Sequence, residues 1–103
     1  MQKLKGSEKK HLRGLAHGLS PIVFIGKQGL SETVISDVVR ALNDHELIKI
    51  KFIDYKDKKK EIIIEIEEKT ESCCAGNVGN VAILYRQQAD PKKRKIKLSK
   101  SNQ

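Results

Sequence analysis

Gly26, Lys27, Gln28 and Gly29 form a GxxG tetrapeptide that stands between a short run of strand-forming residues and a serine suited to begin a helix, Ser31. Two glycines allow a backbone to turn sharply and to approach a ligand without Cβ clashes. The start of a helix presents unpaired N–H groups and a partial positive charge, both of which suit phosphate. Lys27 adds a full charge at the tip of the loop. The pattern therefore predicts a clamp for the phosphate backbone of RNA, of the kind that KH modules build from a GxxG loop.

Basic residues outside the loop are further candidate contacts to a nucleic acid. Twenty-one Lys and Arg against thirteen Asp and Glu give the 103 residues a formal net charge of +8, which attracts polyanions. Each basic group alone is equally consistent with a solvated surface, and a GxxG tetrapeptide alone is often only a turn. Residues 92–97 could likewise be a solubilising end or a flexible arm that wraps RNA. The candidate groups are Lys9, Lys10 and Arg13 in the first helix and Lys49 and Lys51 in a strand.

The sequence lacks the residue patterns that catalysis or metal binding would require. The loop extends to neither GxGxxG nor GxxxxGK[ST], which argues against nucleotide hydrolysis. His11, His17 and His45 have no metal-ligand spacing with one another or with a carboxylate pair. Cys73 and Cys74 are adjacent and have no CxxC partner, so we expect small buried residues in a reduced compartment. We therefore expect a protein without enzymatic activity, metal or cofactor.

The length of the chain suits a single domain with one modest core. No stretch approaches the roughly 18 consecutive apolar residues of a transmembrane helix, and residues 2–13 are too polar for a secretory signal. These features predict a cytoplasmic protein without a membrane partner, and nothing in the sequence requires more than a monomer.

The hydrophobic pattern predicts the elements that position the loop. One helix is expected to begin at an N-cap formed by Ser7 and a second at Ser31, and strands are expected over 22–25, 47–53 and 81–85. The apolar stripes of the two helices are Leu12, Leu15, Ala16 and Leu19, and Val34, Ile35, Val38, Val39 and Leu42.

Residues 61–67 fit two different periods. Ile62, Ile64 and Ile66 alternate as in a strand, and their branched side chains favour that structure. Ile62, Ile63 and Ile66 also form a helical stripe, and the flanking Glu and Lys residues are good helix formers. Periodicity alone leans towards a strand and leaves a helix open.

Aromatic residues are scarce, with two Phe and two Tyr in the chain. Phe24 and Phe52 are expected in the core. Tyr55 and Tyr85 could stack on a base, although packing at a strand end is the better interpretation of Tyr85. Recognition of RNA is therefore expected to depend on backbone and shape more than on stacking.

Several motifs of this chain fall in the order found in the CRM domain, the family named for chloroplast RNA splicing and ribosome maturation. The chain resembles that family over roughly residues 4–98, and a single copy in a short chain resembles the bacterial YhbY-type RNA-binding proteins. The motifs are residues 11–17 (HLRGLAH), Pro21, residues 25–31 (IGKQGLS), residues 45–51 (HELIKIK) and residues 83–86 (ILYR).

The resemblance implies an α+β fold, a two-layer sandwich of order α-β-α-β-α-β-β with a four-stranded mixed sheet. This fold is similar to the C-terminal domain of translation initiation factor three. It implies one domain over residues 1–98, followed by a disordered tail over 99–103. It also implies a helix over 61–69 whose Ile62, Ile63 and Ile66 face the sheet.

The resemblance further implies a function, which is binding to precursors of the large ribosomal subunit through their RNA and assistance in ribosome assembly. The alternative is a protein-interaction module of the translation apparatus. The chain departs from the family where Glu71 replaces a frequent Gly, and where the small residues 74–77 predict a short or frayed third strand. The implied RNA-binding residues are Gly26, Lys27, Gln28, Gly29, Lys9, Lys10, Arg13, Lys49, Lys51 and Arg86.

Overall fold

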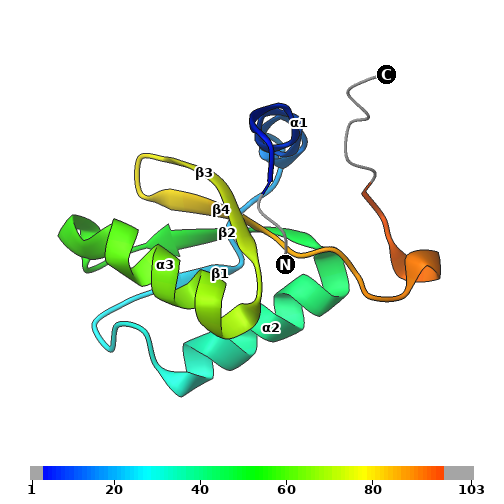
Figure 1. The fold of residues 1–103 in the computed structure, drawn as a ribbon. Helices are drawn as coiled ribbons and strands as arrows, with labels where there is room; N and C mark the ends of the chain where they lie inside the picture. Colours follow the sequence, from blue (N-terminus) through cyan, green and yellow to red (C-terminus); the bar gives the residue numbers. More distant parts are fainter. Residues whose placement is uncertain (1–3, 97–103) are drawn as a thin grey trace.

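The computed structural model describes residues 4–96 and has the element order α-β-α-β-α-β-β that the resemblance implied (Figure 1). The tail predicted over 99–103 lies outside the described residues. Short 3-10 turns flank the main elements at Lys56–Lys58 and Pro91–Lys93. The helices and strands are α1 (Gly6–Ala16), β1 (Val23–Ile25), α2 (Glu32–His45), β2 (Leu47–Phe52), α3 (Lys59–Thr70), β3 (Cys73–Val78) and β4 (Val81–Tyr85).

The four strands form one mixed sheet in the order β1-β2-β4-β3. β1 pairs with β2 in parallel, and β4 pairs with β2 and β3 in antiparallel orientation. β1 and β3 are therefore the edges, and the central strands are the two with the clearest apolar patterns in the sequence. The parallel pairing places the loop after β1 at the same end of the sheet as the last residue of β2, Phe52.

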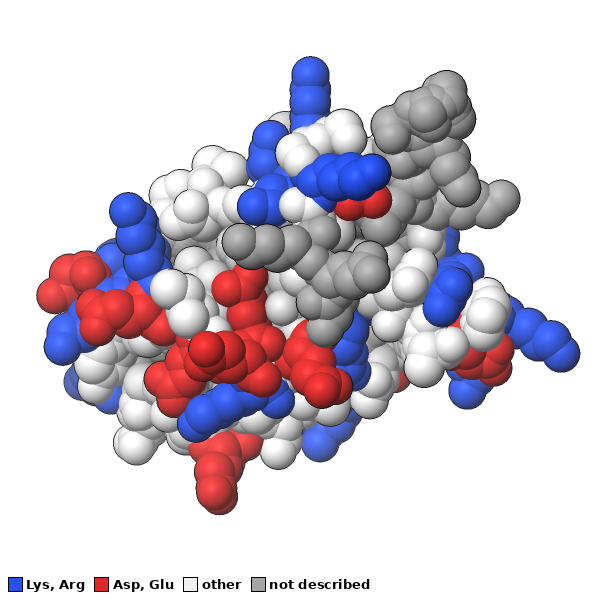
Figure 2. Space-filling model, in the orientation of Figure 1, with Lys and Arg blue, Asp and Glu red and all other residues white. Residues whose placement is uncertain are grey.

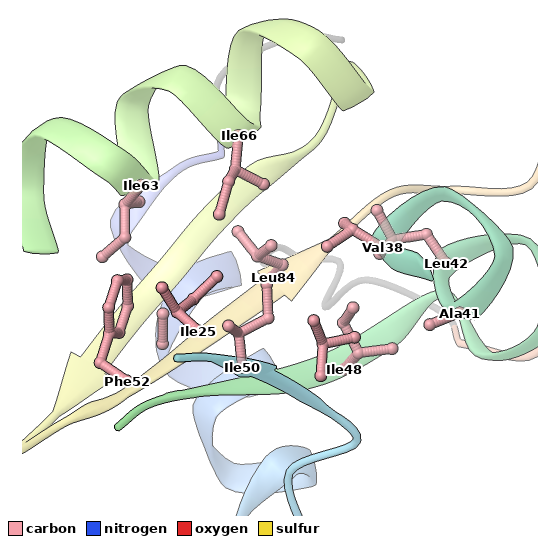
Figure 3. Packing of buried hydrophobic residues seen from close by; sticks show 12 residues of the cluster. Ile25, Val38, Ala41, Leu42, Ile48, Ile50, Phe52, Ile63, Ile66 and Leu84 are labelled. Carbon is pink, nitrogen blue, oxygen red and sulfur yellow. The ribbon is translucent and has the colours of Figure 1, made fainter. Parts of the chain in front are cut away.

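The larger core lies between the sheet and the pair α2 and α3 (Figure 3). Alternate residues of β2 face this core, which confirms the predicted alternation. Residues 61–67 are helical, as the resemblance implied, because Ile63 and Ile66 pack onto the sheet from one face of α3 while Ile64 remains 55% exposed. The fully buried members include Ile25, Val38, Leu42, Ile48, Ile50, Phe52, Ile66 and Leu84.

A second, smaller core lies on the other side of the sheet, under α1 (Figure 1). The sheet, α2 and α3 thus form the two predicted layers, and α1 covers part of the remaining face. Leu12 and Ala16 are fully buried there, whereas the predicted stripe partners Leu15 and Leu19 are 46% and 41% exposed. The prediction that all four residues of the stripe are buried was therefore wrong. α1 packs chiefly on β3, β2 and β4, and this leaves Leu15 and Leu19 beside an open groove.

Two local predictions are corrected by the structure. α1 begins at Gly6, so Ser7 is within its first turn; the backbone N–H of Lys5 donates to the Glu8 carboxylate at 2.8 Å instead. Phe24 is 52% exposed rather than part of the core. The reason is alternation along a short edge strand, since Val23 and Ile25 face α2 and α3 and Phe24 points to the opposite face.

The buried carboxylate of Glu46 fastens the C-terminal segment to the domain. Its Oε2 accepts the backbone N–H of Gln88 at 2.8 Å, and its Oε1 accepts those of Lys95 at 2.7 Å and Ile96 at 3.0 Å. Of the two interpretations of residues 92–97, the flexible arm does not apply as far as Ile96, because charge-assisted hydrogen bonds to Glu46 hold the backbone of Lys95 and Ile96. Lys97 lies outside the described residues.

The end of α3 has a backbone conformation that suits Gly, the residue that the resemblance implied for position 71. Glu71 caps the helix with φ 55° and ψ 44°, the left-handed conformation that side chains disfavour, and its N–H donates to the carbonyl of Glu67. β3 nevertheless follows at its full six residues and pairs with β4 through Val78, so the expectation of a short strand was wrong. The pairing of β3 with β4 shifts its register at a bulge between Cys74 and Gly76.

Glu71→Gly is expected to raise the free energy of unfolding by about 0.5–1 kcal/mol, because glycine removes the left-handed strain of about 1–2 kcal/mol and returns part of it as backbone entropy. Glu71→Ala is the control, since it removes the same charge and keeps the strain. Urea denaturation measures both. A Glu71→Gly protein no more stable than the Glu71→Ala protein would contradict the prediction, because the strain relieved would then not exceed the entropy cost of glycine.

Candidate nucleic-acid interface

The GxxG loop is a tight turn braced by one aromatic side chain. The N–H of Gly29 donates to the carbonyl of Gly26 at 2.9 Å, and Gly29 has a φ of 67°, which favours glycine. Tyr55 donates its hydroxyl to the carbonyl of Lys27 at 3.0 Å, and a Cβ at Gly29 would lie 3.2 Å from its ring. Gly29 is thus required by conformation and by the close ring, whereas a Cβ at Gly26 would meet nothing within 4 Å.

The first turn of α2 points its unpaired N–H groups towards the loop end of the molecule. Ser31 caps the helix as predicted, and its Oγ accepts the N–H of Val34 at 3.2 Å. The N–H groups of Glu32 and Thr33 have no acceptor within the helix, as at any helix start. Free N–H groups at a helix start can bind a phosphate, and the open space at Gly26 lets a ligand approach the backbone there.

Carboxylates share a pocket with Lys27. Asp54 and Asp57 line a pocket of about 370 Å³ together with Lys27, Tyr55 and Lys58. The two carboxylates offset the charges of the two lysines, so the pocket attracts an anion less than Lys27 alone would. On the loop itself, the side chains of Lys27 and Gln28 are exposed.

The α1 side of the sheet brings together the other basic residues of the interface, a set we call the basic face: Lys9, Lys10, Arg13, Lys49 and Lys51. Arg13 donates from Nη1 to the carbonyl of Ala75 at 2.9 Å, and Lys49 donates from Nζ to the carbonyl of Leu19 at 2.8 Å. These bonds hold two cations in place over the sheet while other donors of each group stay available. Arg13 and Lys49 line one groove of about 230 Å³ with His17, Pro21, Val78, Val81 and Ile83.

Arg86 lies apart from the other predicted contacts. It follows β4 at the end of the sheet opposite the loop, and its Nη1 donates to the carbonyl of Thr70 at 2.8 Å. Its Nη2 donates to the side chain of Asn43. The guanidinium therefore joins the ends of α2 and α3, which gives Arg86 a structural role independent of RNA.

The molecule has an acidic side as well. Figure 2 shows acidic side chains gathered over α3 and basic ones over α1. α3 and its cap expose Glu61, Glu65, Glu68 and Glu71, with one neutralising pair, Lys69 to Glu65 at 2.9 Å. Because α1 and α3 lie on opposite faces of the sheet, a polyanion is attracted to the first and repelled by the second.

Sequence reasoning missed two side chains near the loop. Tyr55 braces the loop from a left-handed turn, φ 58°, for which the sequence carries no signal because its partners lie 28 residues away. Phe24 lies on the exposed sheet face, two residues before the loop. The alternation of a strand could have indicated its direction, but three residues are too few to reveal a period.

Burial is the main cause of each pKa shift found among the described residues. Burial raises the pKa of the Cys73 and Cys74 thiols, and the two cysteines, neither of them in a disulfide, are partly buried and pack against opposite cores. Burial, with a smaller effect of the Glu46 carboxylate, raises the pKa of Tyr85 to about 12. Tyr85 is fully buried at the end of β4, as expected, so it presents no ring to a base.

Within residues 4–96 no three His, Cys, Asp or Glu side chains gather as a metal site, and no helix could span a membrane.

Residues 4–86 match the family model described as the CRS1/YhbY (CRM) domain. A protein of Haemophilus influenzae named RNA-binding protein is 38% identical over 93 residues, which cover 89% of this chain and 94% of that protein. A probable RNA-binding protein of Pseudomonas aeruginosa is 32% identical over 98 residues, covering 94% of each. The solution structure of a hypothetical protein from Staphylococcus aureus has a TM-score of 0.79 at 34% identity, covering 93% of this chain and 99% of that chain. The resemblance noted in the motifs is confirmed.

Proposed function

The chain belongs to the CRS1/YhbY (CRM) domain family, and on that premise we propose that it binds RNA, associates with precursors of the large ribosomal subunit and assists their assembly. The observation that carries the proposal is that the GxxG loop follows β1 at the end of the sheet where β2 ends with Lys51, a member of the basic face, and Phe52. In this proposal the loop and the start of α2 bind phosphates through backbone N–H groups, and Lys27 adds charge.

The basic face extends the contact beyond the loop. Lys51 and Lys10 are exposed, and their side chains make no hydrogen bond to any other described residue, so their charges are free to meet phosphates. Arg13 and Lys49 are pre-oriented by their bonds to backbone carbonyls, which lowers the entropy lost when they bind. The four residues of the loop and the five of the basic face make up the proposed site, and Arg86 is left out of it.

The proposed role in ribosome assembly rests on the resemblance of the motifs to the family named for ribosome maturation. A basic surface that reads backbone and shape suits folded ribosomal RNA, because such a surface needs no single base sequence. The acidic side at α3 would stay turned away from the RNA. The protein is proposed to act as a monomer.

A salt titration of RNA binding is the test of this function. With about four to five phosphates contacted, the slope of log affinity against log salt is expected to be about −3 to −4. Filter binding or fluorescence anisotropy between low and moderate salt measures it. A slope shallower than about −1 would contradict a phosphate-based interface and would favour a protein partner bound by apolar contacts.

Sedimentation of cell extract through a sucrose gradient tests whether the protein associates with precursors of the large ribosomal subunit. The protein is expected to migrate with precursors of the large subunit at low salt and to leave them at high salt, because its contacts are electrostatic. Migration as a small free protein at both salt concentrations would contradict the assembly role. It would not contradict RNA binding, which the salt titration tests separately.

A further inference from the structure

The sheet face that α1 leaves uncovered carries an exposed aromatic ring among cations. α1 packs chiefly on β3, β2 and β4, so Ala75 and Ile83 are buried beneath it. Towards the β1 edge and the hairpin turn this cover ends. Phe24 is 52% exposed there and Val78 is 70% exposed. An uncovered sheet surface of this kind presents flat apolar area to solvent.

The strand register sets these side chains in rows. Phe24 of β1 is paired with Lys51 of β2, and Lys51 is paired with Val81 of β4. Paired residues of neighbouring strands point to the same face and lie about 5 Å apart. Across the three strands the row therefore consists of an aromatic, a cationic and an aliphatic side chain. The groove lined by Arg13, Lys49 and Val81 extends this row towards α1.

The row lies next to the proposed phosphate clamp. Phe24 precedes Gly26 by two residues, a distance of about 7 Å along an extended chain. A strand of RNA whose phosphate is held at the loop can therefore reach the Phe24 ring with an adjoining base. The ammonium group of the neighbouring Lys51 has no hydrogen bond to any other described residue and is free to take the next phosphate.

We propose that this row is a stacking site for an unpaired base, with Phe24 as the platform and Lys51 as the phosphate contact beside it, so that the protein selects single-stranded RNA or a loop over a duplex. The inference rests on the proposed function and names the form of RNA that it takes. In an A-form duplex the bases are stacked within the helix and present no face to the ring. In a single strand every base has a free π-face, which makes stacking tolerant of sequence.

The test compares two forms of one RNA against matched variants. The probes are a single-stranded oligonucleotide of about twelve nucleotides and the same sequence in a duplex. Phe24→Ala is expected to weaken binding of the single strand about tenfold and to leave duplex binding and the salt slope unchanged, because stacking is lost and no phosphate contact is. Phe24→Tyr keeps the ring and should retain the affinity.

Ile64→Ala is the matched control, because Ile64 is an equally exposed apolar side chain on the acidic side at α3. It should leave both affinities unchanged. Phe24→Leu keeps an apolar side chain on the edge strand and therefore controls for a folding defect in Phe24→Ala. Its affinity for the single strand should fall nearly as much as that of Phe24→Ala, because both lack the ring.

The outcomes separate the inference from the function on which it rests. If Phe24→Ala binds the single strand as the wild type does, or if the wild type prefers the duplex, the stacking site is refuted while RNA binding stands. If the wild type binds neither RNA, the proposed function itself fails.

Discussion

Replacing Lys27 and Gln28 together with aspartate is expected to lower the affinity for RNA about a hundredfold. The change places two carboxylates where the backbone phosphates are proposed to lie, and like charges brought together cost several kcal/mol, of which about 3 kcal/mol corresponds to this factor. Both side chains are exposed, and the turn is held by backbone atoms and Tyr55, so the fold should persist. Fluorescence anisotropy with a structured RNA measures the affinity, and circular dichroism checks the fold.

The control for this double variant must match its change in net charge. Lys69→Asp combined with Gln87→Asp removes the same amount of positive charge from exposed positions outside the loop, one on α3 and one after β4. This control is expected to lose only a few fold in affinity, through the general field of the protein. If the control loses as much as the loop variant, the loop is not a clamp, and net charge alone explains the binding.

Glu46→Ala is expected to lower the free energy of unfolding by about 3 kcal/mol. Glu46 is fully buried, and three backbone N–H groups of the C-terminal segment lose their charged acceptor at once. Hydrogen bonds to a charged group contribute about 1.5–3 kcal/mol each, and part of this is recovered when the freed segment becomes hydrated. The melting temperature should fall by roughly 15 °C, measurable by calorimetry. Hydrogen exchange should show lost protection at Gln88, Lys95 and Ile96.

Two further variants sharpen this stability test. Glu46→Gln keeps the size of the side chain but turns an amide NH2 group towards one of the N–H donors, so an intermediate loss is expected. Glu68→Ala removes an exposed glutamate of α3 and should change stability by no more than about 0.5 kcal/mol. A Glu46→Ala protein that melts within about 2 °C of the wild type would show that other contacts hold the segment.

Features decided by neighbouring residues could be predicted from the sequence. The loop and the Ser31 cap depend on a few adjacent residues, and the alternation of β2 depends on a run long enough to show its period. Residues 61–67 could not be decided from their own pattern, because three isoleucines satisfied both periods. Packing against the sheet decides in favour of the helix, and family resemblance supplied that information.

Other features depend on partners distant in the chain and leave no local trace. The hydrogen bonds of Glu46 reach residues 42 to 50 positions away, so nothing near Glu46 indicates a buried carboxylate. Arg86 has the same charge as Lys51 and differs only in where the fold places it. A count of charges therefore cannot distinguish the two residues, and hydrophobicity placed Phe24 in a core from which its strand turns it away.

The opposition of the basic face and the acidic surface of α3 makes the molecule an electric dipole. In the field of a folded RNA such a dipole experiences a torque, so that the protein turns its basic face towards the phosphates before contact. Encounters are then productive over a wider range of starting orientations than for a uniformly charged sphere of the same net charge. Association should be fast at low ionic strength and slow as salt shortens the range of the field, even where the contacts at the surface are unaltered.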